Sequence, residues 1–447
     1  MSAADTMSVQ PTGAGRVVPS SSFDFAPLLR EGDVVSWPQG PGEPLGLTGR
    51  LMATRHALPR ARLLLGLLTQ TSVDPAVADR FDVTCLNGAG DARRLTALPD
   101  TRIMPTHVSQ MPELISSGAV RVDVVLIRAR PAREPGVYSL GVIADWVQDL
   151  VAAARVVVAE LDPRLPLTGG DALLSGERIA HFTEADADEV LMPEPVPSDT
   201  DRAIAARVAE LVPDRATVQF GIGGLPSAVC AALAGHRDLG IHSGIITDAA
   251  VDLIEAGVVT NAAKGVDPGL TVTGGLFGTR RLLDHADGNP AIVLRSARYT
   301  HSHAVLAGLR RLHAVNSAVS VDLTGQVNSE VAAGRYVGAV GGQVDFMRGA
   351  RASEGGRAIL ALASTTANGK HSKIVPSLEG VPVSTARTDI DVVVTEQGVA
   401  SLRGLDLEAR RRALIGVAHP AFREMLERAA MEGPDAASRA AQRQVPS

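Results

Sequence analysis

A turn rich in glycine is the first segment of this sequence that could do chemistry. It follows the β-branched run 217–220 and precedes a helix-like segment in which Pro226 stands at a favoured first-turn position. Its residues are Gly221, Ile222, Gly223, Gly224 and Leu225. Glycines let the backbone approach a ligand closely, and a helix N-terminus offers free N–H groups with positive polarity. We expect phosphate, pyrophosphate or an oxyanion there, although a tight strand-to-helix turn would have the same sequence.

A second turn contains Gly341 and Gly342, directly ahead of Gln343. Two adjacent glycines before a polar residue can present backbone N–H donors to an oxygen that gains negative charge during a reaction. The alternative interpretation is a strained turn without a ligand. Neither turn has the GxGxxG spacing of a dinucleotide-binding loop, because position 226 is proline in the first one.

Two segments with histidine could also carry chemistry. His242, Ser243 and Asp248 lie close together in sequence, but a catalytic triad is defined by its geometry. A structural, hydrogen-bonded His242 is therefore the simpler interpretation. His301 and His303 could place two imidazoles on one side of a strand as metal ligands. No cluster of carboxylates or cysteines accompanies them, so we expect no metal.

These segments need a scaffold, and the chain alternates β-branched runs with helical stretches rich in Ala and Leu. This alternation is typical of an α/β fold with parallel strands joined by crossover helices. Strands are predicted at 122–127, 155–161, 217–220, 291–294, 318–323, 358–362 and 391–395, and helices at 139–153 and 201–211.

A segment with three prolines, 192–200 (MPEPVPSDT), predicts a linker between two α/β domains. The domains span residues 23–192 and 200–431, with a disordered leader over 1–22 and a polar tail over 432–447. Two α/β halves of similar size imply a cleft between them, where ligand sites commonly form.

Composition narrows the class of protein. The net charge of −6 and an aromatic content of 3% argue against nucleic acid as a partner. Cys85 and Cys230 lie far apart, so a disulfide framework is not expected. No apolar run reaches the roughly 20 residues of a membrane span. The leader has no apolar core, so it does not resemble a signal peptide, and we expect a cytoplasmic protein.

Taken together, the segments resemble the acetyl-CoA hydrolase/CoA-transferase family, in particular its 4-hydroxybutyrate and butyryl CoA-transferase branch. The most specific matches are GIGGLPSAV (221–229), DLGIHSG (238–244), VDLIEAGVVTN (251–261), SVDLTGQVNSE (320–330), VGGQVDFMRGA (340–350), KIVPSL (373–378), DVVVTEQGVASLRG (391–404) and AHPAFR (418–423). Weaker matches are GDVVSWPQGPGEP (32–44), PTHVSQMPEL (105–114) and VYSLGV (137–142). The resemblance covers nearly the whole chain.

The resemblance implies two open α/β domains with the active site in the cleft between them, and a homodimer without a prosthetic group. In the family, a glutamate attacks an acyl-CoA thioester, which gives an acyl anhydride and then an enzyme–CoA thioester. The loop 221–225, with Gln343, would line the CoA site, and Gly341 and Gly342 would supply donors near the thioester oxygen. The family's glutamate follows a His-Ser or His-Thr pair, and here that position is Gly244.

The missing carboxylate leaves three functions open. We expect an acyl-CoA-dependent transferase or thioester hydrolase in which the acceptor attacks the thioester directly, with His242 as the first candidate for a general base. The alternative is conventional CoA transfer between an acyl-CoA and an acid of the acetate or 4-hydroxybutyrate type, with a carboxylate from elsewhere. A CoA-binding protein without catalytic activity is the third possibility.

Overall fold

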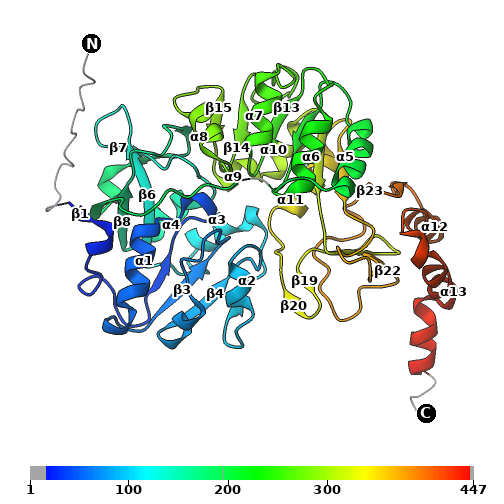
Figure 1. Cartoon of the computed structure of the whole chain (residues 1–447), viewed down its shortest axis with the longest axis horizontal. Helices are drawn as coiled ribbons and strands as arrows, with labels where there is room; N and C mark the ends of the chain where they lie inside the picture. Colours follow the sequence, from blue (N-terminus) through cyan, green and yellow to red (C-terminus); the bar gives the residue numbers. More distant parts are fainter. Residues whose placement is uncertain (1–16, 194, 443–447) are drawn as a thin grey trace.

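A computed structural model describes residues 17–193 and 195–442, and it contains two large sheets (Figure 1). Each sheet is built from one half of the chain, except that residues 169–170 of the first half pair with the edge of the second sheet. The first sheet has the order β1-β11-β8-β6-β2-β3-β4-β5, with β7 and β10 attached at the end of β6. Its strands are β1 (Val18–Pro19), β2 (Val34–Ser36), β3 (Ala61–Leu65), β4 (Phe81–Cys85), β5 (Arg102–Ile103), β6 (Val124–Pro131), β7 (Val137–Ser139), β8 (Val156–Leu161), β10 (Leu173–Ser175) and β11 (His181–Glu184). Its helices are α1 (Leu45–Thr54), α2 (Ala92–Thr96), α3 (Met111–Ser116) and α4 (Val147–Ala153).

The second sheet has the order β24-β23-β21-β16-β12-β13-β14-β15-β9, and every pair except β23·β24 is parallel. Its strands are β9 (Gly169–Gly170), β12 (Thr217–Gln219), β13 (Gly240–Ser243), β14 (Thr271–Thr273), β15 (Ile292–Leu294), β16 (Leu312–Asn316), β21 (Arg357–Ala361), β23 (Val392–Thr395) and β24 (Gly398–Ser401). Its helices are α5 (Asp199–Leu211), α6 (Gly224–Ala232), α7 (Asp248–Glu255), α8 (Arg280–Ala286), α9 (Ala297–Thr300), α10 (His303–Gly308) and α11 (Gln343–Ala352).

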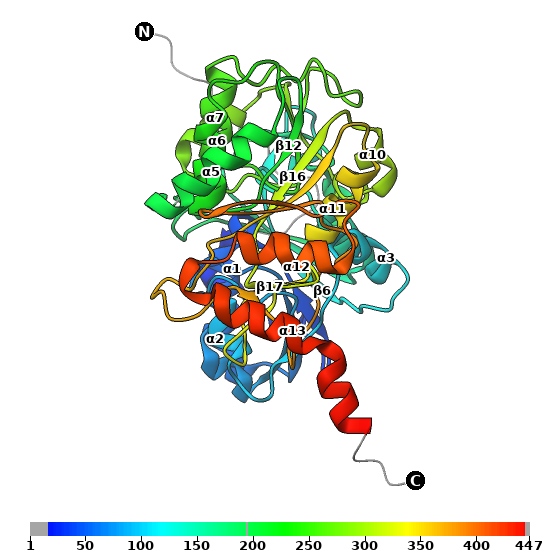
Figure 2. The ribbon, with the colours of Figure 1, turned by 90° about the vertical axis from the view of Figure 1, so that its right-hand side faces the viewer.

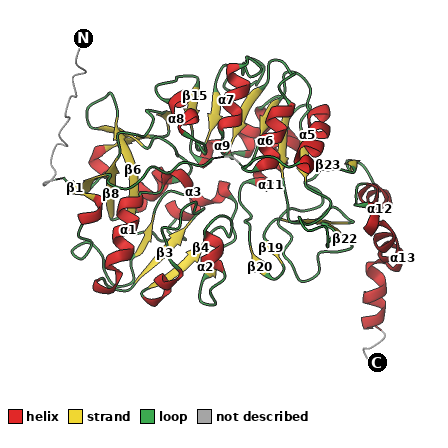
Figure 3. Cartoon of the chain, in the orientation of Figure 1, coloured by secondary structure: helices red, strands yellow, loops and turns green. Residues whose placement is uncertain are grey.

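Smaller elements complete the second half (Figure 3). They are a three-stranded sheet of β17 (Ser320–Asp322), β18 (Val327–Asn328) and β22 (Ile374–Val375), the hairpin β19 (Val331–Ala332) and β20 (Arg335–Tyr336), and the helices α12 (Leu407–Gly416) and α13 (Pro420–Gln442). Among the described residues, no helix is both long and apolar enough to cross a membrane.

Both faces of the second sheet are covered, which explains the near-continuous apolar runs of its strands. Along β23, Val392 and Val394 pack into one apolar cluster and Val393 into another, as expected for side chains that alternate across a sheet. Figure 2 shows helices α5 to α7 on one side of this sheet and α10 and α11 on the other. The first cluster also takes in residues of the first half, such as Val125 and Leu150, so the two halves share a core.

The two sheets are wound in the same way. In the second sheet the chain runs from β12 through β13, β14 and β15 toward one edge, then returns to β16, β21 and β23 on the other side of β12. In the first sheet it runs from β2 to β5 and then returns to β6 and β8 on the other side of β2. Each sheet thus has a topological switch point, and ligands of open α/β sheets bind outside the carboxyl ends of the strands at such points.

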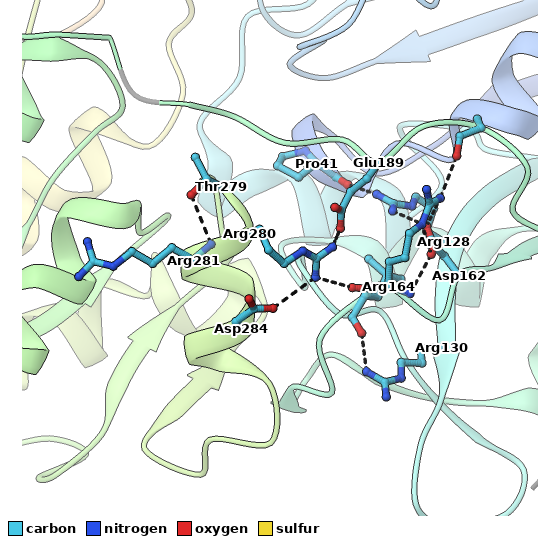
Figure 4. A network of polar contacts seen from close by, with 12 residues as sticks. Pro41, Arg128, Arg130, Asp162, Arg164, Glu189, Thr279, Arg280, Arg281 and Asp284 are labelled. Carbon is cyan, nitrogen blue, oxygen red and sulfur yellow. Dashed lines mark hydrogen bonds and ion pairs between the residues drawn. The ribbon is translucent and has the colours of Figure 1, made fainter. Parts of the chain in front are cut away.

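A polar network joins the two halves (Figure 4). Arg280 of α8 contacts Glu189 and Asp284, and its guanidinium donates to the carbonyl of Arg164. Arg164 and Arg128 both donate to Asp162. Although burial opposes the charge of Asp162, these hydrogen bonds lower its pKa to about 2.

The structure confirms the α/β class and corrects some of the predicted segments. The helix predicted over 139–153 begins only at Val147, because residues 140–146 form a buried loop instead. The leader prediction is wrong for residues 18–22, which form β1 and a 3₁₀ turn, and its first 16 residues lie outside the described ones. The polar tail predicted over 432–447 begins within α13, which ends at Gln442, and residues 443–447 lie outside the described ones.

Candidate active site

A pocket of about 230 Å³ lies between the two halves, at the switch points of both sheets. It is bounded by residues at or just after the ends of β2, β12, β13 and β16, together with the turn that leads into α11. The lining residues with polar side chains or glycine backbone are Gln39, Asn87, Thr106, Asp145, Gln219, Gly221, Gly244, His301, Asn316, Gly341, Gly342 and Gln343. The apolar lining includes Trp146, Phe220, Ile222, Phe277 and Phe346.

The first glycine turn contributes only its beginning to the pocket. Gly221 and Ile222 line it, whereas Gly223, Gly224 and Leu225 do not. Gly223 has φ 120°, a conformation that glycine tolerates best, and it is the N-cap of α6 without a side-chain cap. The N-cap residue of α6 therefore offers no side-chain acceptor to the first turn of the helix, whose positive end faces the direction from which an anion would approach.

The second glycine turn reaches the pocket in full. Gly341, Gly342 and Gln343 all line it, and Gly342 is the N-cap of α11, again without a side-chain cap. The carbonyl of Gly341 accepts a hydrogen bond from the N–H of Val108, a residue of the first half. The turn is thus tied to the opposite wall of the pocket.

Gly244 also lines the pocket, directly after the end of β13. Its neighbour His242 does not line the pocket, against the expectation that it is the first candidate for a general base. The ring of His242 is buried and its Nε2 lies 3.1 Å from the carbonyl oxygen of Thr300. Burial lowers the pKa of His242 to about 4, so the structure gives this residue a core position.

His301 lines the pocket, a role that the sequence analysis did not assign to it. Its Nδ1 lies 2.9 Å from Oγ1 of Thr300, and that hydroxyl donates to the carbonyl of Ser296. The hydroxyl proton is used, so Nδ1 carries the ring proton and donates, and Nε2 is left as an acceptor. Burial lowers the pKa of His301 to about 3, which keeps the ring neutral.

The ring of His301 lies against two of the predicted glycines. A Cβ on Gly244 would meet its Cε1 at 3.0 Å and its Nε2 at 3.1 Å, and a Cβ on Gly342 would meet its Cδ2 at 2.7 Å. The alternative in which His301 and His303 share one side of a strand does not occur, because His301 follows α9 and His303 begins α10. No three His, Cys, Asp or Glu side chains of the described residues are grouped to hold a metal ion.

Asp145 is the only carboxylate that lines the pocket among the residues the structure describes. Its Oδ2 accepts a hydrogen bond of 2.7 Å from Nε2 of Gln39, another lining residue. Burial raises the pKa of Asp145 to about 7, and the hydrogen bond from Gln39 only partly offsets this.

Two amides form a neutral part of the wall at the ends of β12 and β16. Asn316 Nδ2 donates to Gln219 Oε1 at 2.9 Å, and the reciprocal contact is 3.4 Å. No Lys or Arg lines the pocket within the described part of the chain. An anionic group bound here would therefore rely on helix N-termini and neutral donors rather than on a salt bridge.

Sequence reasoning missed Gln39, Asp145, Gln219 and Asn316. Asp145 had a visible signal, since it is a lone charge inside the apolar stretch GVIADWV (141–147). The two amides and Gln39 had none, because a polar residue at the end of a strand is common in any fold.

Comparisons of the chain with known proteins show its class. Residues 278–430 match the acetyl-CoA hydrolase/transferase C-terminal domain. The chain is 40% identical over 323 residues to the 4-hydroxybutyrate coenzyme A transferase of Clostridium kluyveri, covering 72% of this chain and 75% of that protein. It is 31% identical to the butyryl-CoA:acetate CoA-transferase of Anaerostipes caccae, covering 82% and 84%. RipA from Yersinia pestis has a similar structure, with a TM-score of 0.85, 30% identity and coverage of 91% and 95%.

The fold and these relatives define an enzyme of the CoA-transferase class. The chain belongs to the acetyl-CoA hydrolase/CoA-transferase family, as its sequence motifs predicted.

Proposed function

We propose that this protein transfers CoA between an acyl-CoA thioester and a free carboxylic acid. One observation carries the proposal: a single pocket between the halves unites both glycine turns with Gly244, the position that we assign to the family's glutamate. The relatives of known name include CoA transferases that act on 4-hydroxybutyrate and on butyryl-CoA with acetate. Conventional CoA transfer is thus better supported than the reaction by direct attack that we first expected from the sequence.

The dimensions and polarity of the pocket suit the reacting end of the substrate. Its volume of about 230 Å³ lies below the roughly 300–1,000 Å³ of sites that hold whole drug-sized ligands. We therefore place the thioester and a short acyl chain inside it, with the rest of CoA outside. The helices α6 and α11 both have glycine as the N-cap, and their starts would provide N–H donors to a phosphate or to the thioester oxygen.

Thioester hydrolysis is a second candidate, because His301 presents an acceptor nitrogen in the pocket. A water molecule that donates to Nε2 could attack the acyl carbonyl, with its proton passing to the imidazole. The low pKa of this ring makes it a weak base at neutral pH, so we rank hydrolysis second.

An exchange assay separates these functions. The protein is incubated with butyryl-CoA and ¹³C-acetate, then with a series of other short acids, and acyl-CoA products and free thiol are measured in parallel. CoA transfer predicts new acyl-CoA that depends on the acid, with little free thiol. Free thiol that forms at the same rate without any acid would support hydrolysis instead. Binding of butyryl-CoA without either product would contradict both and support a non-catalytic protein.

A further inference from the structure

We propose that Asp145 is the nucleophile of this enzyme and replaces the carboxylate that is missing at position 244. The inference rests on the proposed CoA-transfer function. It adds a catalytic residue from the first half of the chain, because the second half has a glycine, Gly244, at the position of the family's glutamate.

The two oxygens of Asp145 are in different situations. Oδ2 is held by Gln39, which in turn is fixed because its own Oε1 accepts a hydrogen bond from the N–H of Leu67. Oδ1 accepts no hydrogen bond from any residue that the structure describes, yet it is not sealed from solvent. Since Asp145 lines the pocket, Oδ1 is the oxygen that a ligand can reach.

Asp145 also lies next to the position of the missing side chain. A Cβ placed on Gly274 would be 2.7 Å from Asp145 Oδ1 and 2.7 Å from the carbonyl oxygen of Gly244. The carboxylate and the Gly244 carbonyl therefore border the same small space, which a side chain on Gly274 would fill. An acyl carbonyl within reach of a side chain at 244 would also be near this carboxylate.

The backbone at Asp145 is strained, and its surroundings hold it in place. Its φ is 27°, a value that residues with a side chain rarely adopt. The carbonyl of Asp145 accepts from the N–H of Ala297 at 2.6 Å, and the preceding Ala144 donates to Gly274 at 2.8 Å. Such strain persists only where the structure enforces it, and it is concentrated at functional sites.

Among the described residues no other carboxylate lines the pocket, neither the buried Glu43 nor the half-buried Asp345 and Asp248. Glu43 is bound to Ser72, Asp345 accepts from the hydroxyl of Ser109, and Asp248 accepts from Thr279, and none of the three acids lines the pocket. On the opposite side, the neutral ring of His301 fills the space beside Gly244. The reacting carboxylate must therefore come from the side of Asp145.

The chemistry balances with this one carboxylate. Asp145 Oδ1 attacks the acyl carbonyl carbon, the C–S bond breaks, and CoA leaves as the thiolate, which gives a mixed anhydride. The thiolate attacks Cγ of Asp145 and releases the first acid as its carboxylate, which leaves an aspartyl-CoA thioester. The second carboxylate attacks Cγ and expels the thiolate, and the thiolate then takes the second acyl group and frees Asp145.

Burial of the carboxyl is compatible with this role. A pKa near 7 leaves a substantial fraction ionised at neutral pH, and the carboxylate is more basic than one in water. The rate of CoA transfer should therefore fall as the pH drops below about 7, because protonated Asp145 cannot attack.

The direct test traps the enzyme–CoA thioester and locates it. Wild-type protein is incubated with butyryl-CoA, reduced with borohydride, and digested for peptide mass spectrometry. We expect reduction to convert Asp145 to homoserine, and trapping without borohydride to show CoA on the same peptide. Conversion of any other residue, or an enzyme that transfers CoA with no adduct at all, would overturn the assignment while the proposed function stands.

A variant completes the test with a matched control. Asp145→Asn keeps the shape and can still pair with Gln39, and it should lower the rate of CoA transfer by about 1,000-fold or more while acyl-CoA still binds. Glu43→Gln makes the same change at a buried acid outside the pocket and should leave the rate within about threefold, within the range usual for sites remote from catalysis. Transfer by Asp145→Asn at a rate near that of wild type would overturn the inference. Absence of transfer in the wild type would instead reject the proposed function.

Discussion

The two halves of this molecule share one winding scheme but contribute differently to the pocket. In the second half, the glycines Gly221 and Gly244 follow closely on the ends of β12 and β13, and the wall offers mainly backbone and neutral side chains. The first half ends β2 near Gln39 and supplies Asp145, the pocket's carboxylate. A wall of glycine lets a ligand approach closely but leaves no side chain to react. The reactive group then has to come from the facing half.

The largest expected effect comes from a methyl group added to the glycine wall. In Gly342→Ala, the new Cβ would meet the ring of His301 at 2.7 Å or closer, and this ring is buried. Because the ring cannot retreat freely, we expect CoA transfer to slow by about 100-fold through misplacement of the turn. We also expect the free energy of unfolding to fall by about 1–3 kcal/mol. Steady-state kinetics and urea unfolding measure the two effects.

The control for this variant is Gly235→Ala. No atom lies within 4 Å of a Cβ at position 235, and that residue is outside the pocket. Its activity and stability should match those of the wild type. If Gly342→Ala also matched the wild type, the contact between position 342 and the ring of His301 would not hold the turn in place.

The second prediction restores a side chain to the glycine wall. Gly244→Glu alone meets the ring of His301 at 3.0 to 3.1 Å, so the glutamate cannot settle without displacing it. Gly244→Glu combined with His301→Ala removes the obstacle. We expect the double variant to transfer CoA about tenfold faster than Gly244→Glu alone, the size of a coupling between residues in contact.

An equal rate in the single and double variants would show that His301 does not fill the place of the missing side chain. A trapped adduct on residue 244 in the double variant would show that this position can carry the reaction.

The sequence predicted the α/β class, the division into two halves and the glycine turns, because strand runs and glycines follow local rules. It also predicted that Gly244, Gly341 and Gly342 belong to one site, through resemblance to a family. Boundaries were less accurate where a segment is held by the other half. The loop at 140–146 resembles the start of a helix, yet its carbonyl and amide groups pair with Gly274 and Ala297.

The roles of the two pocket residues that can titrate were beyond the sequence. Whether a histidine lies in the core or in a pocket depends on contacts between distant segments, and His242 and His301 differ in this respect. Asp145 is visible in the sequence as a lone charge in an apolar stretch, but its position beside Gly244 depends on its contact with Gly274. Neither relation follows from local spacing.

The third prediction concerns stability and tests the burial of Asp145. The pKa of this group is about 7 in the folded protein against an ordinary 3.8, so the folded form binds a proton that the unfolded chain has lost. Wild-type stability should therefore decline from about pH 4 to about pH 7 through this group. Asp145→Asn cannot ionise and should be more stable than wild type at pH 8, by about 1–3 kcal/mol.

Chemical unfolding at pH 4 and pH 8 checks this sign. The two proteins should be nearly equal at pH 4, where Asp145 is protonated in the folded state. If the variant were less stable than wild type at pH 8, burial of the ionised carboxylate would not destabilise the folded protein.

The smallest expected effect concerns a hydrogen bond between the two halves beside the pocket. Ser109 Oγ of the first half donates to Asp345 Oδ1 of α11 at 2.7 Å. Ser109→Ala removes this hydrogen bond, and we expect it to cost about 1 kcal/mol of stability. KM for acyl-CoA should rise by about fivefold, which is the same energy expressed in binding. A change in kcat larger than that in KM would place Ser109 in the reaction itself.

A crystal structure of Asp145→Asn with butyryl-CoA tests the central claim most directly, namely that the first half supplies the reacting carboxylate and the second half supplies backbone donors. We predict that the thioester carbonyl lies between the side chain of residue 145 and the turn at Gly341 and Gly342, with the pantetheine leaving past the start of α6. A thioester bound outside this pocket, or one whose carbonyl carbon faces away from residue 145, would contradict the account.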